Sequence, residues 1–97
     1  MEEIEVKRVI LRLSPLAEKQ LRRGRTYRRG DIQRRVREAL VLAETANVDN
    51  VPASRDCVTS VPLTVEEIQR VDSIARRRGV SRMTLINACL LASKNSA

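Results

Sequence analysis

The chain has 97 residues, a formal net charge of +7 and a sequence pI near 10.7. A chain of this length normally makes one domain, and its charge favours a polyanionic partner, such as nucleic acid or an acidic membrane surface, over a merely soluble basic protein. The sequence contains no His, Trp or Phe, and Tyr27 is its only Tyr. Recognition of single-stranded bases by stacking is therefore disfavoured, because it needs aromatic platforms.

Catalysis is disfavoured as well. Without His, and with only Cys57 and Cys89 as thiols, the chain cannot assemble a zinc-ligand set or a Cys–His nucleophile pair. We therefore expect a protein that is not an enzyme and that binds no metal or cofactor. The cysteines have unrelated spacing and follow no signal peptide, which fits reduced thiols in the cytoplasm better than a disulfide. No apolar run approaches the roughly 18 residues of a membrane span.

The first predicted element is a strand over residues 6–13, in which apolar and other residues alternate. One face of this strand is apolar and consists of Val9, Leu11 and Leu13. The opposite face is cationic and consists of Arg8, Ile10 and Arg12. This pattern indicates a strand that buries one face and exposes the other.

Two helices are predicted after this strand. Ser14 and Pro15 begin the first, since a Ser hydroxyl caps free amide groups and Pro fits the first helical position. It should run to about residue 25, with a thin apolar face made of Leu16, Ala17 and Leu21. Asp31 caps the second, which should run to Glu44 with apolar residues at helical spacing: Ile32, Val36, Ala39, Leu40 and Ala43. The opposite side of this second helix carries Arg34, Arg35 and Arg37.

The same series of elements follows a polar linker over residues 45–55. A β-branched strand over residues 56–63 contains Pro62 near its end, and Thr64-x-x-Glu67 is a capping box for the next helix. That helix closes at Arg78-Gly79, where Gly suits a left-handed cap. The last helix begins at Ser81, and its apolar arc is wide enough to predict a central place in the core: Leu85, Ile86, Cys89 and Leu90, flanked by Met83, Leu91 and Ala92.

The two halves therefore repeat one pattern at a spacing of 50 residues. Leu13-Ser14-Pro15 corresponds to Leu63-Thr64-Val65, and Asp31 corresponds to Ser81. Between residues 9 and 43 only three positions are identical in both halves: Leu13/Leu63, Arg28/Arg78 and Leu40/Leu90. We predict one domain over residues 1–97, built from units at 6–44 and 56–93 whose strands pair into an antiparallel ribbon above four helices.

This order of elements resembles the ribbon-helix-helix family, the Arc and MetJ repressor type. The resemblance rests on Leu13-Ser14-Pro15, Leu63-Thr64, the loop glycines Gly30 and Gly79, and Ser81-x-x-x-Leu85-Ile86-x-x-Cys89-Leu90 with its counterpart; it covers about 85 of the 97 residues. In that family two chains each contribute a strand, and the ribbon enters the DNA major groove. Because one chain carries both halves here, the resemblance is to the tandem arrangement of TraY-like conjugation proteins and implies a monomeric pseudo-dimer.

The resemblance also implies roles for individual residues. Base edges would be read by the outward strand residues Arg8, Ile10, Arg12, Val58 and Ser60. Arg suits guanine, whose O6 and N7 accept paired donors, whereas Ile and Val make apolar contacts such as those with thymine methyl groups. A slip of one residue in the second strand would present Cys57 and Thr59 instead. The alternative for Arg8 and Arg12 is a solvated face that protects an edge strand.

DNA phosphates would be bound at the start of each unit's second helix, where free amide groups and the helix dipole favour an anion. The predicted phosphate-binding residues are Arg28, Arg29, Arg76, Arg77, Arg78, Ser81 and Arg82. Six to eight such contacts predict a log–log salt slope of about −5 to −7. The alternative for these Arg runs is a solubilising surface.

The two units differ in charge and in sequence. Residues 1–44 hold 12 Lys/Arg and 7 Asp/Glu, whereas residues 45–97 hold 7 and 5. In the second strand Asp56 would repel phosphate, and Pro62 stands where the first strand has Arg12. We therefore predict a non-palindromic DNA site that is read chiefly by the first unit.

The favoured function is sequence-specific binding of double-stranded DNA by a transcriptional repressor that acts by occupancy. One alternative is an accessory protein that marks or bends an origin of conjugative transfer for a relaxase, which the tandem layout suggests by family resemblance alone. An antitoxin is less favoured, because no long extension is present to wrap a toxin. A different class is a helical interaction module in which residues 31–44 dock on an acidic partner or membrane.

The DNA-binding interpretation places the protein in a prokaryotic cytoplasm, associated with a nucleoid or a plasmid. Whether pseudo-dimers line up on adjacent DNA sites stays open at this stage.

Overall fold

The structure is a computed structural model that describes residues 5–22, 31–49, 51–52 and 56–93; the side chain of Asp31 is outside this description. The described part of the first half contains β1 (Val6–Leu13), α1 (Pro15–Leu21), α2 (Asp31–Leu40) and the short 3-10 helix η1 (Val41–Glu44). The second half contains β2 (Cys57–Thr64), α3 (Val65–Arg77) and α4 (Arg82–Ala92). The predicted combination of a two-stranded antiparallel sheet with helices is confirmed.

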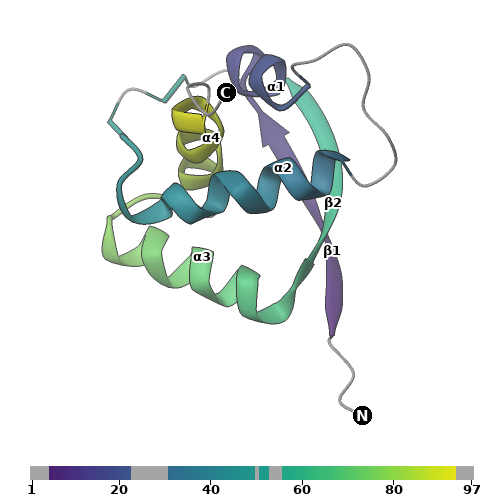
Figure 1. Ribbon diagram of the computed structural model, residues 1–97. Coiled ribbons are helices and arrows are strands. Elements are labelled where there is room, and N and C mark those ends of the chain that lie inside the picture. The colour runs from purple at the N-terminus through teal and green to yellow at the C-terminus, as the bar shows by residue number, and fades with distance from the viewer. Residues whose placement is uncertain (1–4, 23–30, 50, 53–55, 94–97) are drawn as a thin grey trace.

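β1 and β2 pair antiparallel, and both run along one side of the helices (Figure 1). Arg8 lies opposite Pro62, Ile10 opposite Ser60, and Arg12 opposite Val58. The face toward the helices is buried at Val9, Leu11, Leu13, Val61 and Leu63. Since strand side chains alternate between faces, this register turns Val58 and Ser60 outward and excludes the one-residue slip. The first strand has the predicted bounds, and the second lies one residue later than predicted.

Side-chain caps fix where three of the helices begin. The Ser14 hydroxyl accepts from the Ala17 amide at 3.2 Å, and the Ser81 hydroxyl accepts from the Thr84 amide at 3.1 Å. At α3 the capping box is complete, because Thr64 accepts from the Glu67 amide while the Glu67 carboxylate accepts from the Thr64 amide. Gly79 follows α3 with φ of 73°, the left-handed geometry that favours glycine. These predicted caps are confirmed.

The centre of the core is α4, as its wide apolar arc predicts. It contacts β1, α1, α2, α3 and η1. Its residues from 85 to 90 are all buried, including Cys89. Although α4 is the most apolar helix, none of the helices in the described residues is long and apolar enough to cross a membrane.

Two predictions about the first half need correction. Leu16 was assigned to the buried face of α1 but is 56% exposed, whereas Ala17 and Leu21 are buried. The second helix ends at Leu40, and its predicted last turn is the separate 3-10 helix η1. In the described part of the predicted linker, residues 45–49 and 51–52, Ala46 is buried and Val48 and Val51 pack against the core. The predicted end of the first helix near residue 25 lies outside the described residues.

One buried polar residue joins α4 to the end of β1. The Asn87 side chain accepts from the Ser14 amide at 2.8 Å and donates to the carbonyl oxygens of Arg12 at 3.0 Å and Met83 at 2.7 Å. Asn87 is completely buried, and so is Ser14. The turn between β1 and α1 therefore obtains its backbone hydrogen bonds from a residue more than 70 positions away.

We expect Asn87→Leu to lower the free energy of unfolding by about 2–4 kcal/mol, because it leaves the buried Ser14 amide and Arg12 carbonyl without partners. Urea denaturation would measure the change. The control is Asn47→Leu, at an exposed Asn whose side chain accepts only from the nearby Asp49 amide. Equal effects of the two substitutions would contradict the anchoring role of Asn87.

Burial raises the pKa of the Cys89 thiol from 9.0 to about 11. The folded thiol thus keeps its proton where the unfolded one loses it, so its contribution to stability is complete below pH 9 and is lost as the pH rises toward 11.

We expect a thiol reagent at pH 8 to label the half-buried Cys57 first and Cys89 only after unfolding. Cys57→Ser should remove the fast phase; a fast phase that persists in this variant would place Cys89 in contact with solvent.

Candidate nucleic-acid interface

The candidate interface is the face of the ribbon that points away from the helices. We call it the outer ribbon face and define it by eight residues: Val6, Arg8, Ile10, Arg12, Val58, Ser60, Pro62 and Thr64. Three of them are large apolar residues with about half their surface in solvent: Val6 at 48%, Ile10 at 58% and Val58 at 57%. The face includes two Arg residues and no acidic residue.

The structure brings the five predicted base-reading residues together on this face. They occupy three adjacent cross-strand pairs: Arg8 opposite Pro62, Ile10 opposite Ser60, and Arg12 opposite Val58. A narrow band of the ribbon therefore combines guanidinium donors with exposed methyl groups. Such a combination can hydrogen-bond to guanine and make apolar contact with thymine.

The two arginines of the outer ribbon face are held differently. Arg8 donates from Nη1 to the Ser60 hydroxyl on the neighbouring strand at 3.0 Å. Arg12 is fixed through its backbone, because its amide donates to the Met83 sulfur at 3.4 Å and its carbonyl accepts from Asn87. The Arg12 side chain is exposed and has no ion-pair partner among the described residues.

The N-terminus of α4 lies beside β1, since Met83 in its first turn contacts Arg12. The first turn contains no acidic residue, and Ser81 caps it from an exposed position. Arg82, however, is held by α3: its Nε and Nη2 each donate to Asp72 at 2.6 Å. This contact lowers the pKa of Asp72 and raises the pKa of Arg82.

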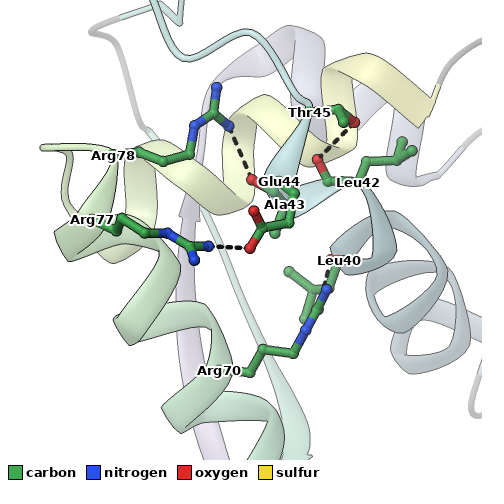
Figure 2. Close-up of polar contacts among 8 residues, drawn as sticks. All are labelled: Leu40, Leu42, Ala43, Glu44, Thr45, Arg70, Arg77 and Arg78. Carbon is green, nitrogen blue, oxygen red and sulfur yellow. Dashed lines mark hydrogen bonds and ion pairs between the residues drawn. The ribbon is translucent and has the colours of Figure 1, made fainter.

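Two more of the predicted phosphate-binding arginines make contacts within the chain, and the Arg77 contact lies on the surface (Figure 2). Arg78 donates to the Ala43 carbonyl at 2.9 Å, and Arg77 forms an ion pair with Glu44. Arg70, which is not among the functional residues predicted from the sequence, donates to the Leu40 carbonyl at 3.1 Å. The last carbonyl groups of a helix need donors from elsewhere. Arg70 of α3 and Arg78, the residue that follows α3, supply them to α2 and η1.

Arg76 differs from its neighbours Arg77 and Arg78. It is exposed and makes no hydrogen bond or ion pair with the described residues, although it lies close enough to Asp72 to contribute to that residue's lowered pKa. Arg76 is therefore the predicted phosphate contact that the described fold leaves most available, whereas the exposed Ser81 hydroxyl donates to Thr84 Oγ1 at 3.0 Å. Arg28 and Arg29 lie outside the described residues.

The three arginines on the side of α2 opposite its apolar stripe have different environments. Arg34 is exposed, but Arg35 donates to the Leu21 carbonyl at 2.8 Å, and Arg37 pairs with Glu67 at 3.0 Å. Both contacts link α2 to another helix of the chain.

An acidic group lies near one end of the ribbon. Glu18 forms hydrogen bonds with the Cys57 thiol and with Arg22, and both lower its pKa, the Cys57 contact most. The same contact raises the pKa of Cys57.

Among the described residues, no group of His, Cys, Asp or Glu side chains could hold a metal ion.

Comparison of the chain with known protein families, with curated proteins and with solved structures finds no match. Its function is therefore inferred from the geometry of the ribbon and the helices.

We expect Arg78→Ala to lower the free energy of unfolding by about 1–2 kcal/mol, because the Ala43 carbonyl loses a charged donor. Arg76→Ala removes the same charge from an exposed position two residues away and should change stability by less than about 0.5 kcal/mol. Urea denaturation of both variants would test the difference. Equal stability of the two variants would assign Arg78 to the solvated surface.

Proposed function

We propose that this chain binds double-stranded DNA in a sequence-specific manner by inserting the outer ribbon face into the major groove. The observation that carries the proposal is the exposure of Arg8, Ile10, Arg12 and Val58 on one face of a ribbon whose other face is buried. The major groove admits a two-stranded β-ribbon and displays a distinct pattern of donors, acceptors and methyl groups for each base pair. A ribbon face with guanidinium groups beside exposed methyl groups suits that pattern.

The register supports a pseudo-dimer within one chain. Ile10 pairs with Ser60, and these two residues occupy equivalent positions of the 50-residue repeat. Two residues before this pair on each strand are Arg8 and Val58, and two residues after it are Arg12 and Pro62. The members of each of these sets are also equivalent in the 50-residue repeat. A ribbon centred on such a pair is what two related units produce when they pair about a two-fold axis.

The packing of the helices supports the same arrangement. α2 contacts β2, and α4 contacts β1, so each unit's second helix lies on the other unit's strand. The side chains at equivalent positions of these helices, Arg37 and Asn87, bind near the strand–helix junction of the opposite unit, at Glu67 and Ser14. Such reciprocal contacts are expected of a ribbon-helix-helix pseudo-dimer.

Binding to phosphates is proposed at the N-terminus of α4, with Ser81 and Arg76 as contacts. Because Arg77, Arg78 and Arg82 already bind within the fold, fewer cations are available than their number in the sequence suggests. Without these three arginines, the six to eight contacts predicted from the sequence become three to five, which correspond to a log–log salt slope of about −3 to −4.5.

The biological role that we propose is repression of transcription by occupancy of a promoter. Binding at a conjugative origin would use the same face, so the two roles are separated by the target sequence. Docking of α2 on an acidic partner is less well supported, because Arg35 and Arg37 bind within the chain.

The first test is selection from a randomised duplex library at about 0.15 M salt, a concentration that screens weak non-specific binding. We expect one enriched motif for the wild-type chain. The double variant Arg8→Ala and Arg12→Ala should bind that motif at least about thirtyfold more weakly, because each good Arg–guanine pair contributes roughly 1–3 kcal/mol.

A charge-matched control separates base reading from general attraction. Lys7→Ala with Lys19→Ala removes two exposed charges from positions outside the outer ribbon face. This variant should retain the motif and lose affinity evenly across sequences. Salt-dependent binding without any enriched sequence, or equal effects of the two double variants, would contradict specific reading by the ribbon.

A further inference from the structure

We propose that Ser60 is a positioning residue, which holds Arg8 against a guanine near the centre of the DNA site and thereby makes recognition asymmetric. This inference rests on the proposed DNA-binding function and names how the outer ribbon face selects its sequence. It assigns Ser60 an action on Arg8 rather than on a base.

The first step is the contact between the strands. Arg8 lies opposite Pro62, yet its Nη1 donates to the hydroxyl of Ser60, two residues along β2 and at the centre of the ribbon. The guanidinium group is therefore drawn from its own cross-strand pair toward the Ile10–Ser60 pair. Pro62 offers no hydrogen-bonding group that would compete with Ser60.

The second step concerns the donors that remain. A guanidinium group has five N–H donors in a fixed planar fork. One bond to Ser60 leaves enough donors for the paired contact with guanine O6 and N7. Because the bond to Ser60 also restricts the rotamers of a long exposed side chain, less conformational entropy is lost when Arg8 binds a base.

The third step is the comparison with the other half of the ribbon. The position equivalent to Arg8 is Val58, and the position equivalent to Ser60 is Ile10, so the contact has no symmetry mate. Arg12 is held through its backbone instead, and its equivalent is Pro62. Both donors that suit guanine thus come from β1, and the β2 residues opposite them, Pro62 and Val58, are apolar.

The spacing of the two arginines limits the distance between their targets. They are four residues apart on β1, or about 13 Å at 3.3 Å per residue. The Ser60 contact draws the Arg8 guanidinium toward the centre and shortens this span. With a rise of about 3.4 Å per base pair, we expect the two guanines to lie roughly two to four base pairs apart.

The test compares the motifs selected from one randomised duplex library by the wild-type chain and by the variants Arg8→Ala, Arg12→Ala, Ser60→Ala and Ser60→Thr. We expect the wild-type motif to contain two preferred guanines and no two-fold symmetry. Arg8→Ala should remove the preference at one guanine and Arg12→Ala at the other, each by about 5- to 150-fold.

Ser60→Ala should lower the preference at the Arg8-dependent guanine by about two- to tenfold and leave the Arg12-dependent guanine unchanged. Ser60→Thr retains a hydroxyl and should retain the preference. Ser60 is not fully buried and makes no bond to the core, so thermal unfolding should show both variants folded.

The outcomes separate this inference from the proposed function. If Ser60→Ala lowers the preference for both guanines equally, or changes neither preference, the positioning role is overturned and specific DNA binding is left intact. A palindromic motif with Arg8-dependent guanines in both halves does the same. Failure of the wild-type chain to enrich any sequence overturns both.

Discussion

The pairing of β1 with β2 is the constraint on which the rest of the structure depends. Neither strand is stable alone, and each carries a single apolar face that must be covered. Pairing across 50 residues places Val9, Leu11 and Leu13 beside Val61 and Leu63, and the buried surface of α4 closes over them. Because the side-chain period of a strand is two, the same register that builds this core also turns Arg8, Ile10, Arg12 and Val58 toward solvent. Core and candidate interface are thus two consequences of one pairing.

The arginines of the chain divide between two tasks. Arg70 and Arg78 donate to carbonyl groups near the end of α2, and Arg37 and Arg82 pair with carboxylates on α3. These contacts join the two halves of the chain or fix neighbouring helices, and so compensate for the small core of a short protein. On the outer ribbon face, by contrast, both arginine side chains are exposed: Arg8 donates to the Ser60 hydroxyl, and the Arg12 side chain has no ion-pair partner among the described residues. Net charge therefore overstates the number of cations that a polyanion would meet.

Much of the local structure follows from the sequence because it depends on short-range chemistry. The alternation of β1 fixes its two faces, and Ser14, Thr64 and Ser81 accept from the amide groups of the helices they begin. Sequence reasoning fails where the partner is distant. Asn87 looks like a polar interruption of an apolar helix, yet it completes the turn after β1. Leu16 fits the apolar pattern of α1 but lies in solvent, because seven residues form only two turns and their orientation is set by packing.

The sequence by itself determined that two strands occur, that Ser14, Thr64 and Ser81 cap helices, and which residues share each face of β1, because these follow from periodicity and from contacts within three or four residues. Only the tertiary structure decided the register of β2, the burial of Asn87 and the binding of Arg70, Arg77, Arg78 and Arg82 within the fold. The physical reason is that an arginine's hydrogen-bond partner is any carbonyl or carboxylate within reach in space, and the Arg70 and Arg78 partners lie 30 and 35 residues away along the chain. The periodicity of a sequence predicts which face of a helix or strand a side chain occupies. Whether that side chain can bind a ligand depends on the contacts that it makes with distant parts of the chain.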